Sequence, residues 1–303
     1  MRNTITFLFT FIVSAVWICS CGEGTVEIGE NTYTPKIVVE GYLCPGQKVR
    51  NIRVTRNIPL NTSPNPLSVI LSGADVRIVD LQTNKEFNLT YNRTDYAFEY
   101  NGSDLSINYD DSYLINVNAD IDGRNLQTSA TTRVPRAGFK INLENSNILP
   151  MYYRERDENN NVKNFSIAFS PSPATEFYVF SIVPLDASDS TFNYDNAYVA
   201  VDKEDVAKEL DRFKYQLRWL QNVNSYGEEI IFNVDWINLW FYGRYRIIAY
   251  AGDDNYKNYA LTYKMVQEFD GNFHEPKMKL SGDGIGVFAS VIPDTVYIEI
   301  KRR

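Results

Sequence analysis

The sequence predicts a mainly β protein of two β-sandwich domains, immunoglobulin-like in general architecture, with two helical insertions in the second domain. Aromatic residues make up 14% of the 303 residues, including 21 Tyr and 17 Phe, and such residues are typical of strands and filled sheet cores. Short segments of alternating polarity follow one another, and turn-forming residues separate them. Two segments with helical spacing of apolar residues occur, both in the second half.

The N-terminal segment predicts where the protein goes. Arg2 precedes an apolar run, Ile5–Ile18, which is too short for a permanent membrane-spanning helix but suits a signal peptide. The run ends in Ser20-Cys21, and a polar spacer follows. This pattern is typical of a bacterial lipobox, so we expect residues 1–20 to be a lipoprotein signal peptide and Cys21 to be lipidated. An ordinary secretory signal that merely contains cysteines is the alternative.

The first predicted domain spans residues 34–135 and follows a polar tether, residues 21–33. Its expected strands are Thr34–Leu43, Val49–Arg56, Ala74–Asp80, Glu86–Tyr91, Tyr96–Tyr100, Tyr113–Ala119 and Leu126–Val134. Such a series of short strands within about 110 residues favours an antiparallel sandwich. The segment Pro135–Gly138 breaks the pattern and marks the predicted domain boundary.

The second predicted domain spans residues 139–303. Its expected strands are Lys140–Glu144, Val162–Phe169, Glu176–Pro184, Glu229–Val234, Leu239–Tyr250, Gly284–Val291 and Thr295–Lys301, the last two forming a hairpin around Pro293-Asp294. The expected helices are Asp202–Gln221 and Asp254–Phe269, because apolar residues recur there every three or four positions. We expect both helices to pack on the sheet of their own domain rather than to bind a partner helix.

The charge of the chain excludes one class of function. The 30 basic residues include Arg2 of the signal, so 29 remain against 38 acidic residues in the mature chain, a formal net charge of −9. A protein of this charge, with no basic patch in its sequence, does not bind nucleic acid through counterion release. We therefore expect no nucleic-acid partner.

Cysteine and histidine are too scarce for the usual catalytic and metal sites. Cys19 leaves with the signal and Cys21 carries lipid, so Cys44 has no disulfide partner and is expected to be a half-buried apolar residue. The single histidine, His274, can form neither a His-rich zinc site nor, without a nucleophile motif, a Ser-His-Asp triad. We interpret it as a loop residue.

Neighbouring carboxylates occur at Asp110-Asp111, Asp157-Glu158, Glu228-Glu229 and Asp253-Asp254. Each pair lies beside turn formers, so solvated loops or helix caps are expected rather than the spaced carboxyl pair of a glycosidase. Asp253-Asp254 is expected to begin the second helix. The sequence therefore predicts no catalytic, cofactor-binding or metal-binding residue and no cofactor, although a calcium site in one of these loops stays open.

Two further motifs have competing interpretations. The glycines of Gly282–Gly286 lack the context of a phosphate loop, so we expect them to allow a bulge or a close approach to another backbone. The aromatic segments Met151–Tyr153 and Trp240–Tyr242 could stack on sugars, but packing in the strand cores is the favoured interpretation.

Several segments together resemble a known family. They are the lipobox at Cys21, the first strand Pro35–Gly41, the segment Gly73–Asp80, the strand ending at Pro135, and the glycine-containing run Gly282–Ala289. In these segments the chain resembles the lipoproteins of Bacteroidota catalogued as domain of unknown function 4249. The resemblance implies an outer-membrane lipoprotein, frequently associated with TonB-dependent transporters, and it implies no known reaction.

These observations lead to an expected function. We expect a non-catalytic accessory or binding component of a TonB-dependent nutrient-uptake system, held to the outer membrane by lipid on Cys21 and facing either the periplasm or the cell surface. A hydrolase of envelope polymers or glycans is one alternative. A structural, adhesin-like surface protein is the other.

Overall fold

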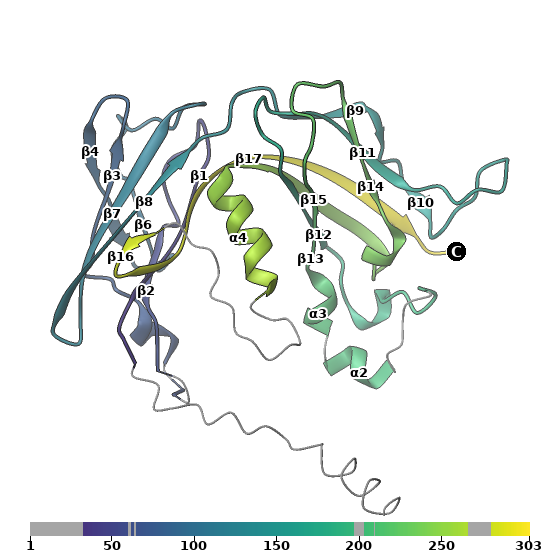
Figure 1. Ribbon diagram of the computed structural model, residues 1–303. Coiled ribbons are helices and arrows are strands. Elements are labelled where there is room, and N and C mark those ends of the chain that lie inside the picture. The colour runs from purple at the N-terminus through teal and green to yellow at the C-terminus, as the bar shows by residue number, and fades with distance from the viewer. Residues whose placement is uncertain (1–32, 60–61, 64, 197–202, 209, 266–279) are drawn as a thin grey trace, which may run out of the picture. The chain divides into compact units, whose positions relative to one another are not determined.

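Strands dominate the regular structure, so the protein is mainly β, as the sequence predicts. The computed structural model describes residues 33–59, 62–63, 65–196, 203–208, 210–265 and 280–303 (Figure 1). Pro35–Ile58 and Ser63–Arg303 form one compact unit. The described residues contain two separate clusters of buried apolar side chains, which we call the first core and the second core.

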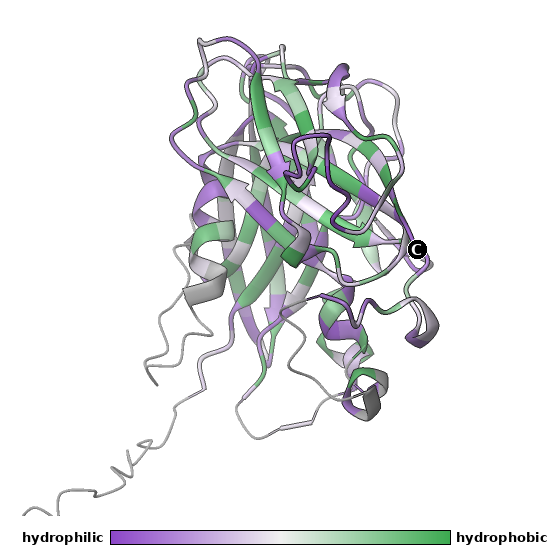
Figure 2. Cartoon of the chain, turned by 90° about the vertical axis from the view of Figure 1, so that its right-hand side faces the viewer, coloured by the Kyte–Doolittle hydropathy of each residue, from purple (hydrophilic) through white to green (hydrophobic). Residues whose placement is uncertain are grey.

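The first core lies among strands from the first half of the chain. These are β1 (Ile37–Leu43), β2 (Arg53–Arg56), β3 (Asp75–Asp80), β4 (Lys85–Asn88), β5 (Thr90–Asn92), β6 (Ala97–Glu99), β7 (Ser112–Ile121) and β8 (Arg124–Arg133). A five-stranded sheet has the order β16-β8-β7-β3-β4, in which the short β16 (Ser281–Gly282) comes from the second half of the chain, and β5 pairs with β6. Buried and less buried residues alternate along β1 and β7, which is the period-two pattern of a half-buried sheet. Figure 2 shows hydrophobic and hydrophilic residues interspersed along the strands of the molecule.

The second core lies among strands from the second half. These are β9 (Lys140–Asn147), β10 (Met151–Tyr152), β11 (Phe165–Ser170), β12 (Tyr178–Pro184), β13 (Gln216–Leu220), β14 (Ile230–Val234), β15 (Gly243–Gly252) and β17 (Gly284–Lys301). One sheet has the order β13-β12-β15-β17-β1-β2, with β10 paired to β17, and another has the order β14-β11-β9. Short 3-10 helices occur at Pro66–Val69, Asp189–Thr191 and Trp236–Asn238.

Strand β17 is shared by both cores, and the hairpin predicted around Pro293-Asp294 is wrong. Gly284–Ser290 pairs in parallel with β1, and Val291–Ile300 pairs antiparallel with β15. Proline is tolerated within this strand because no described strand other than β15 pairs with it there. Phe288 of β17 is 1% exposed and belongs to the first core. The predicted first domain, residues 34–135, has β8 as its last strand. It does not contain the whole first core, because Phe288 lies outside it.

The helix predicted over 202–221 is wrong in its second half. Within the described residues, α2 (Lys203–Lys208) and α3 (Leu210–Lys214) are helical, and β13 then pairs antiparallel with β12. Val206 and Phe213 of the helical part are buried, whereas Leu217 is 48% exposed, so the apolar spacing marks a buried helical face only as far as α3. The open edge of β12 supplies backbone hydrogen bonds, and this tertiary pairing overrides local helical periodicity.

Helix α4 (Asp254–Met265) begins where the sequence predicts, and its predicted extension to Phe269 lies outside the described residues. Tyr256 on α4 makes an edge-to-face contact with Tyr42 of β1, with ring centroids 5.9 Å apart. The same ring lies 6.1 Å from Tyr250 of β15. Tyr256 of this helix therefore packs on the central sheet, as expected for a residue of a core stripe.

The glycines of the Gly282–Gly286 segment permit a close approach of backbones, as predicted. Gly286 has φ +120°, and a Cβ added there would lie 2.0 Å from the carbonyl oxygen of Val39. A Cβ on Gly284 would lie 2.0 Å from Thr128 Oγ1. Larger residues would separate β17 from β1 and from β8, so these glycines allow one strand to complete the first core.

Candidate functional site

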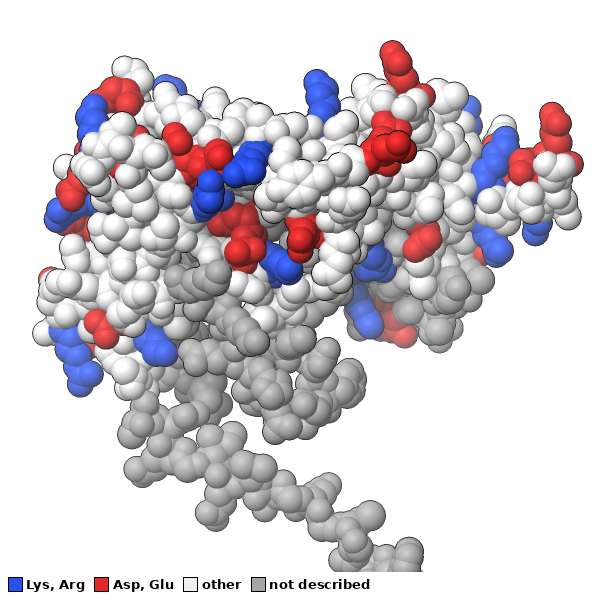
Figure 3. All heavy atoms as spheres, turned by 45° about the horizontal axis from the view of Figure 1, so that its top comes forward, with Lys and Arg blue, Asp and Glu red and all other residues white. Residues whose placement is uncertain are grey.

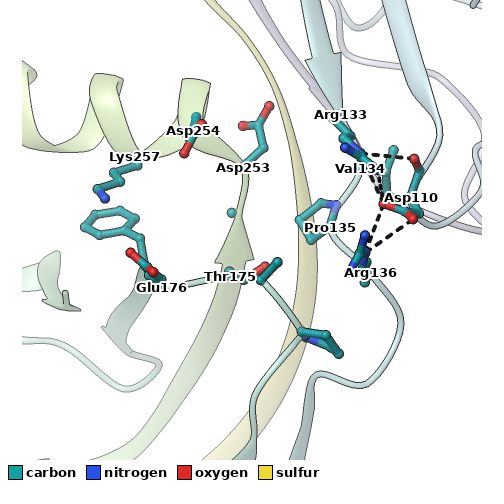
Figure 4. Close-up of a pocket in the computed structure, with 14 residues that line it drawn as sticks. Asp110, Arg133, Val134, Pro135, Arg136, Thr175, Glu176, Asp253, Asp254 and Lys257 are labelled. Carbon is teal, nitrogen blue, oxygen red and sulfur yellow. Dashed lines mark hydrogen bonds and ion pairs between the residues drawn. The ribbon is translucent and has the colours of Figure 1, made fainter. Parts of the chain in front are cut away.

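A cleft of about 330 Å³ lies where segments from the two cores meet, and we call it the junction cleft (Figure 4). Its lining comes from the end of β8 and the following Val134–Arg136, from the connection between β11 and β12, and from the β15–α4 turn. The lining residues are Asp110, Arg133, Val134, Pro135, Arg136, Pro173, Ala174, Thr175, Glu176, Phe177, Gly252, Asp253, Asp254 and Lys257. Most of these residues are polar or charged.

One side of the junction cleft holds a closed cluster of charges. Asp110 Oδ1 lies 2.7 Å from Arg133 Nη2, and Asp110 Oδ2 lies 3.3 Å from Arg136 Nε. Partial desolvation raises the pKa of Asp110, but the guanidinium groups of Arg136 and Arg133 lower it, and the net shift is downward. Asp110 has φ 66°, so its backbone turns sharply to present the carboxylate to both arginines. All three side chains are exposed, and such pairs contribute little to stability.

Asp253 connects the two cores through a buried polar network. Its Oδ1 accepts a hydrogen bond from the backbone N–H of Tyr256 at 2.9 Å and so caps α4. Its Oδ2 accepts the Thr132 hydroxyl at 2.6 Å, and Thr132 Oγ1 lies 2.8 Å from Ser290 Oγ. Thr132 is on β8 and Ser290 is on β17, where that strand exchanges β1 for β15 as its partner. Burial raises the pKa of the Asp253 carboxyl despite these hydrogen bonds.

The remaining charges of the cleft are available to a ligand. In the part of the chain that the structure describes, Glu176, Asp254 and Lys257 have no side-chain hydrogen bond or ion pair. Figure 4 shows these three side chains on the α4 side of the cleft, opposite the Asp110 cluster. Figure 3 shows acidic and basic side chains close together on this part of the surface. Carboxylates and an ammonium group in one cleft can bind a polar solute that carries its own donors and acceptors.

The cleft lacks the usual parts of a catalytic centre. Its lining contains no histidine and no cysteine. No group of three or more His, Cys, Asp or Glu residues that could hold a metal occurs among the described residues. Among the lining carboxyls, burial raises the pKa of Asp253, which is the direction that general acid–base chemistry requires of a carboxyl.

Several residues singled out in the sequence fall outside the described residues. Cys19, the expected lipidation site Cys21, and His274 are among them. Cys44 is free and partly buried, and burial raises the pKa of its thiol, which fits an unreactive apolar role.

The other carboxylate pairs occupy turns, as expected. Asp157 Oδ1 accepts the backbone N–H groups of Asn159 and Asn161 at 2.9 and 2.8 Å. Glu229 accepts the side-chain amides of Asn142 and Asn145 at 2.6 and 2.8 Å. These carboxylates stabilise loops and have no partner carboxylate in a cleft.

The aromatic segments are mostly core, as favoured. Phe241 and Met151 are 0% and 5% exposed, and Trp240 packs against the second core. Tyr152 differs, since it is 43% exposed.

The polar network around Asp253 could not be located from the sequence. The one signal is Thr132, a polar residue at an inward position of a strand whose other inward positions are Leu126, Thr128 and Ala130. Ser290 gave no signal, because the sequence predicts a hairpin next to it, whereas β17 continues there without a turn.

Comparison with known families identifies the chain's relatives. Residues 23–290 match the family described as domain of unknown function DUF4249. The chain belongs to this family. The match covers nearly all of the predicted mature chain and agrees with the resemblance found in its motifs. No curated protein matches the chain.

Solved structures show only a distant likeness. A DUF4785 family protein from Legionella pneumophila is 11% identical with a TM-score of 0.25, and the match covers 70% of this chain and 51% of that one. A tetra-tandem repeat of a large adhesion protein is 12% identical with a TM-score of 0.22, covering 88% and 49%. The FN1–FN3 domains of chicken CNTN1 are 10% identical with a TM-score of 0.18, covering 86% and 65%. The chain thus spans about half the length of the first two structures.

No helix among the described residues of this DUF4249 member is both long enough and apolar enough to cross a membrane.

Proposed function

We propose that this DUF4249 protein is an outer-membrane lipoprotein anchored through Cys21. We further propose that it binds a polar solute without transforming it and that it serves a TonB-dependent uptake system. The anchor is supported by the lipobox pattern, since the several acyl chains of a bacterial lipoprotein hold a protein firmly to a membrane. The transporter partner is supported by the family resemblance. The binding role is supported by the junction cleft.

The observation that carries the binding role is the pair of free charges, Glu176 and Lys257, in the junction cleft. Elsewhere in the same cleft, the carboxylate of Asp110 is paired with Arg133 and Arg136. Glu176, between β11 and β12, and Lys257, on α4, line the junction cleft and are both available to bind a ligand. A solute carrying both an acceptor and a donor would bridge them.

We further propose that each core defines a β-sandwich domain and that the junction cleft is an interdomain site. Two separate apolar clusters and the break at Pro135–Gly138 support this division. Strand β17 then belongs to both domains and couples them. Clefts between domains are common positions for ligand sites.

A hydrolase is the second candidate, and one observation favours it. Asp253 has a raised pKa and lines the same cleft, as a general acid would. Against this, its two oxygens accept hydrogen bonds from Tyr256 and Thr132, which suits a helix cap and a structural link.

Native mass spectrometry of the full-length protein, extracted in detergent from its own membranes, tests the binding role. We expect a bound small solute in the wild type and its loss in the charge-reversed variants Glu176→Lys and Lys257→Glu. Lys140→Glu, an exposed substitution on β9, is the matched control and should retain the solute. A wild type that carries no solute, or variants that retain it, would contradict the role of this cleft.

The same preparations separate partner from catalyst. A TonB-dependent transporter should co-purify with the wild type and be lost in Cys21→Ala. Hydrolysis of envelope glycans or peptides that disappears in Asp253→Asn would replace the binding proposal with the hydrolase.

A further inference from the structure

The two aromatic segments found in the sequence meet at a second cleft, of about 480 Å³, which we call the tyrosine cleft. Tyr152 of β10 and Tyr242, which directly precedes β15, both line it. The end of β17 brings them together, because Met151 and Tyr152 pair with Ile300 and Lys301 while Gly243 also pairs with Ile300. Residues about ninety positions apart therefore line one cavity.

Tyr152 is an exposed aromatic side chain on a fixed backbone. It is 43% exposed, whereas Met151 beside it is 5% exposed and anchors the short strand in the second core. The backbone N–H of Tyr152 donates to Glu155 Oε2 at 3.1 Å, and Glu155 Oε1 lies 2.7 Å from Lys163 Nζ. A ring held in this way can bind a flat apolar surface at a small cost in conformational entropy.

Tyr242 forms a wall of the cleft rather than a second platform. It is 8% exposed, its hydroxyl donates to Asp195 Oδ2 at 2.7 Å, and the guanidinium carbon of Arg302 lies 5.5 Å from its ring centroid. Arg302 Nη1 also donates to the carbonyl of Ser190 at 3.3 Å. These contacts fix the wall that faces a ligand stacked on Tyr152.

Hydrogen-bonding groups of both kinds surround the exposed ring. Glu299 and Lys301 lie on either side of the buried Ile300, so both side chains project from the same face of β17. Within the described part of the protein, neither forms a side-chain hydrogen bond or ion pair. The lining contains two acidic and two basic side chains, the others being Asp186 and Arg302, so its formal charge cancels.

We propose that the tyrosine cleft binds a neutral oligosaccharide. The C–H face of a sugar ring packs on an aromatic ring such as that of Tyr152, while its hydroxyl groups both donate and accept hydrogen bonds, to Glu299 and from Lys301. The balanced charge of the lining does not select an anionic polymer. This inference stands on residues separate from those of the junction cleft.

Calorimetric titration of the full-length, detergent-solubilised protein tests the proposal. The probes are neutral hexasaccharides of β-1,4-glucose, α-1,4-glucose, β-1,4-mannose and β-1,4-xylose. At least one should bind, with affinity reduced about tenfold or more in Tyr152→Ala. Tyr152→Phe should bind like the wild type, because the ring and not the hydroxyl forms the platform.

Two controls make the outcome decisive. Tyr215→Ala removes another exposed tyrosine, 69% exposed and outside this cleft, and should leave binding unchanged. Lys257→Glu of the junction cleft should also bind the sugar normally, so failure of one cleft does not imply failure of the other. The proposal is overturned if none of the four hexasaccharides binds, if Tyr152→Ala keeps wild-type affinity, or if only an acidic polygalacturonate binds.

Discussion

The two cores of this protein are built from different side chains. Of the buried residues in the first core, three of twenty are aromatic, namely Phe98, Tyr113 and Phe288. In the second core twelve of twenty-six are aromatic. The first is therefore an aliphatic core between regular strands, and the second is held by contacts between rings, many of them edge-to-face or tilted. Large rings bury more area each, so single residues carry more of the stability of the second core.

The difference also explains where irregular structure and clefts occur. Aliphatic residues at every second position suffice to cover the regular strands of the first core. Rings reach further, so the second core can include side chains from helices and loops, such as Phe192, Phe213 and Trp236. The segment around the 3-10 helix Asp189–Thr191 brings Asp186 and Ser190 to the tyrosine cleft, whereas Tyr152 reaches it through the pairing of β10 with β17.

The largest effect is expected for Phe180→Ala in the second core. Phe180 is fully buried, and its ring stacks on Phe232 with centroids 3.7 Å apart and planes 8° apart. We expect the free energy of unfolding to fall by about 3–5 kcal/mol, because a large cavity replaces the ring. Urea unfolding followed by circular dichroism measures it. Ile231→Ala, 58% exposed on neighbouring β14, is the control and should change stability by less than about 0.5 kcal/mol.

A smaller effect is expected for Gly286→Ala, which tests the junction of β17 with the first core. The new Cβ would lie 2.0 Å from the carbonyl oxygen of Val39, at a φ of +120° that alanine rarely adopts. We expect a loss of about 2–3 kcal/mol in the free energy of unfolding. Gly73→Ala has no neighbour within 4 Å and is the matched control. Equal unfolding midpoints for the two variants would show that β17 can shift away from β1 without cost.

The same contrast decides how much of the fold could be predicted from the sequence. The sequence predicts strands β3, β7 and β8 within a few residues, because their inward and outward residues alternate regularly and the hairpins β3–β4 and β7–β8 join neighbouring segments. Strand β13 was mistaken for helix, since its apolar residues fall at helical spacing and only β12, far earlier in the chain, makes it a strand. Pro293-Asp294 was mistaken for a turn, because only the pairing with β15 shows the strand to be continuous.

The clefts were less predictable than the strands. The aromatic segments were recognised, but the sequence could not show that Tyr152 alone stays exposed while its neighbours are buried. The junction cleft assembles from Asp110 and three longer stretches of chain, Arg133–Arg136, Pro173–Phe177 and Gly252–Lys257, whose approach depends on long-range packing. Asp253-Asp254 was expected to begin a helix, which is correct, and its contact with Thr132 depends on the same packing.

The smallest effect is expected from Asp253→Asn, which examines the polar link between the cores through its dependence on pH. Burial raises the pKa of folded Asp253 above its ordinary value of 3.8, so the native state keeps the proton to higher pH than the unfolded chain does. Its contribution to stability is fully present below pH 3.8 and is lost as the pH rises through the raised pKa. The wild type should therefore lose stability relative to Asp253→Asn as the pH rises above 3.8 and through the raised pKa.

Asp186→Asn supplies a control of opposite sign within the second half of the molecule. The hydrogen bonds from Arg244 lower the pKa of Asp186 to about 2, so its contribution is present above pH 3.8 and is lost as the pH falls toward 2. Relative to that variant, the wild type should gain stability as the pH rises from 2 to 4. Urea unfolding of the wild type, Asp253→Asn and Asp186→Asn, from pH 2 to above pH 4, measures how each difference in the free energy of unfolding changes with pH. If the Asp253→Asn difference does not change with pH, Asp253 is not held in a desolvated site.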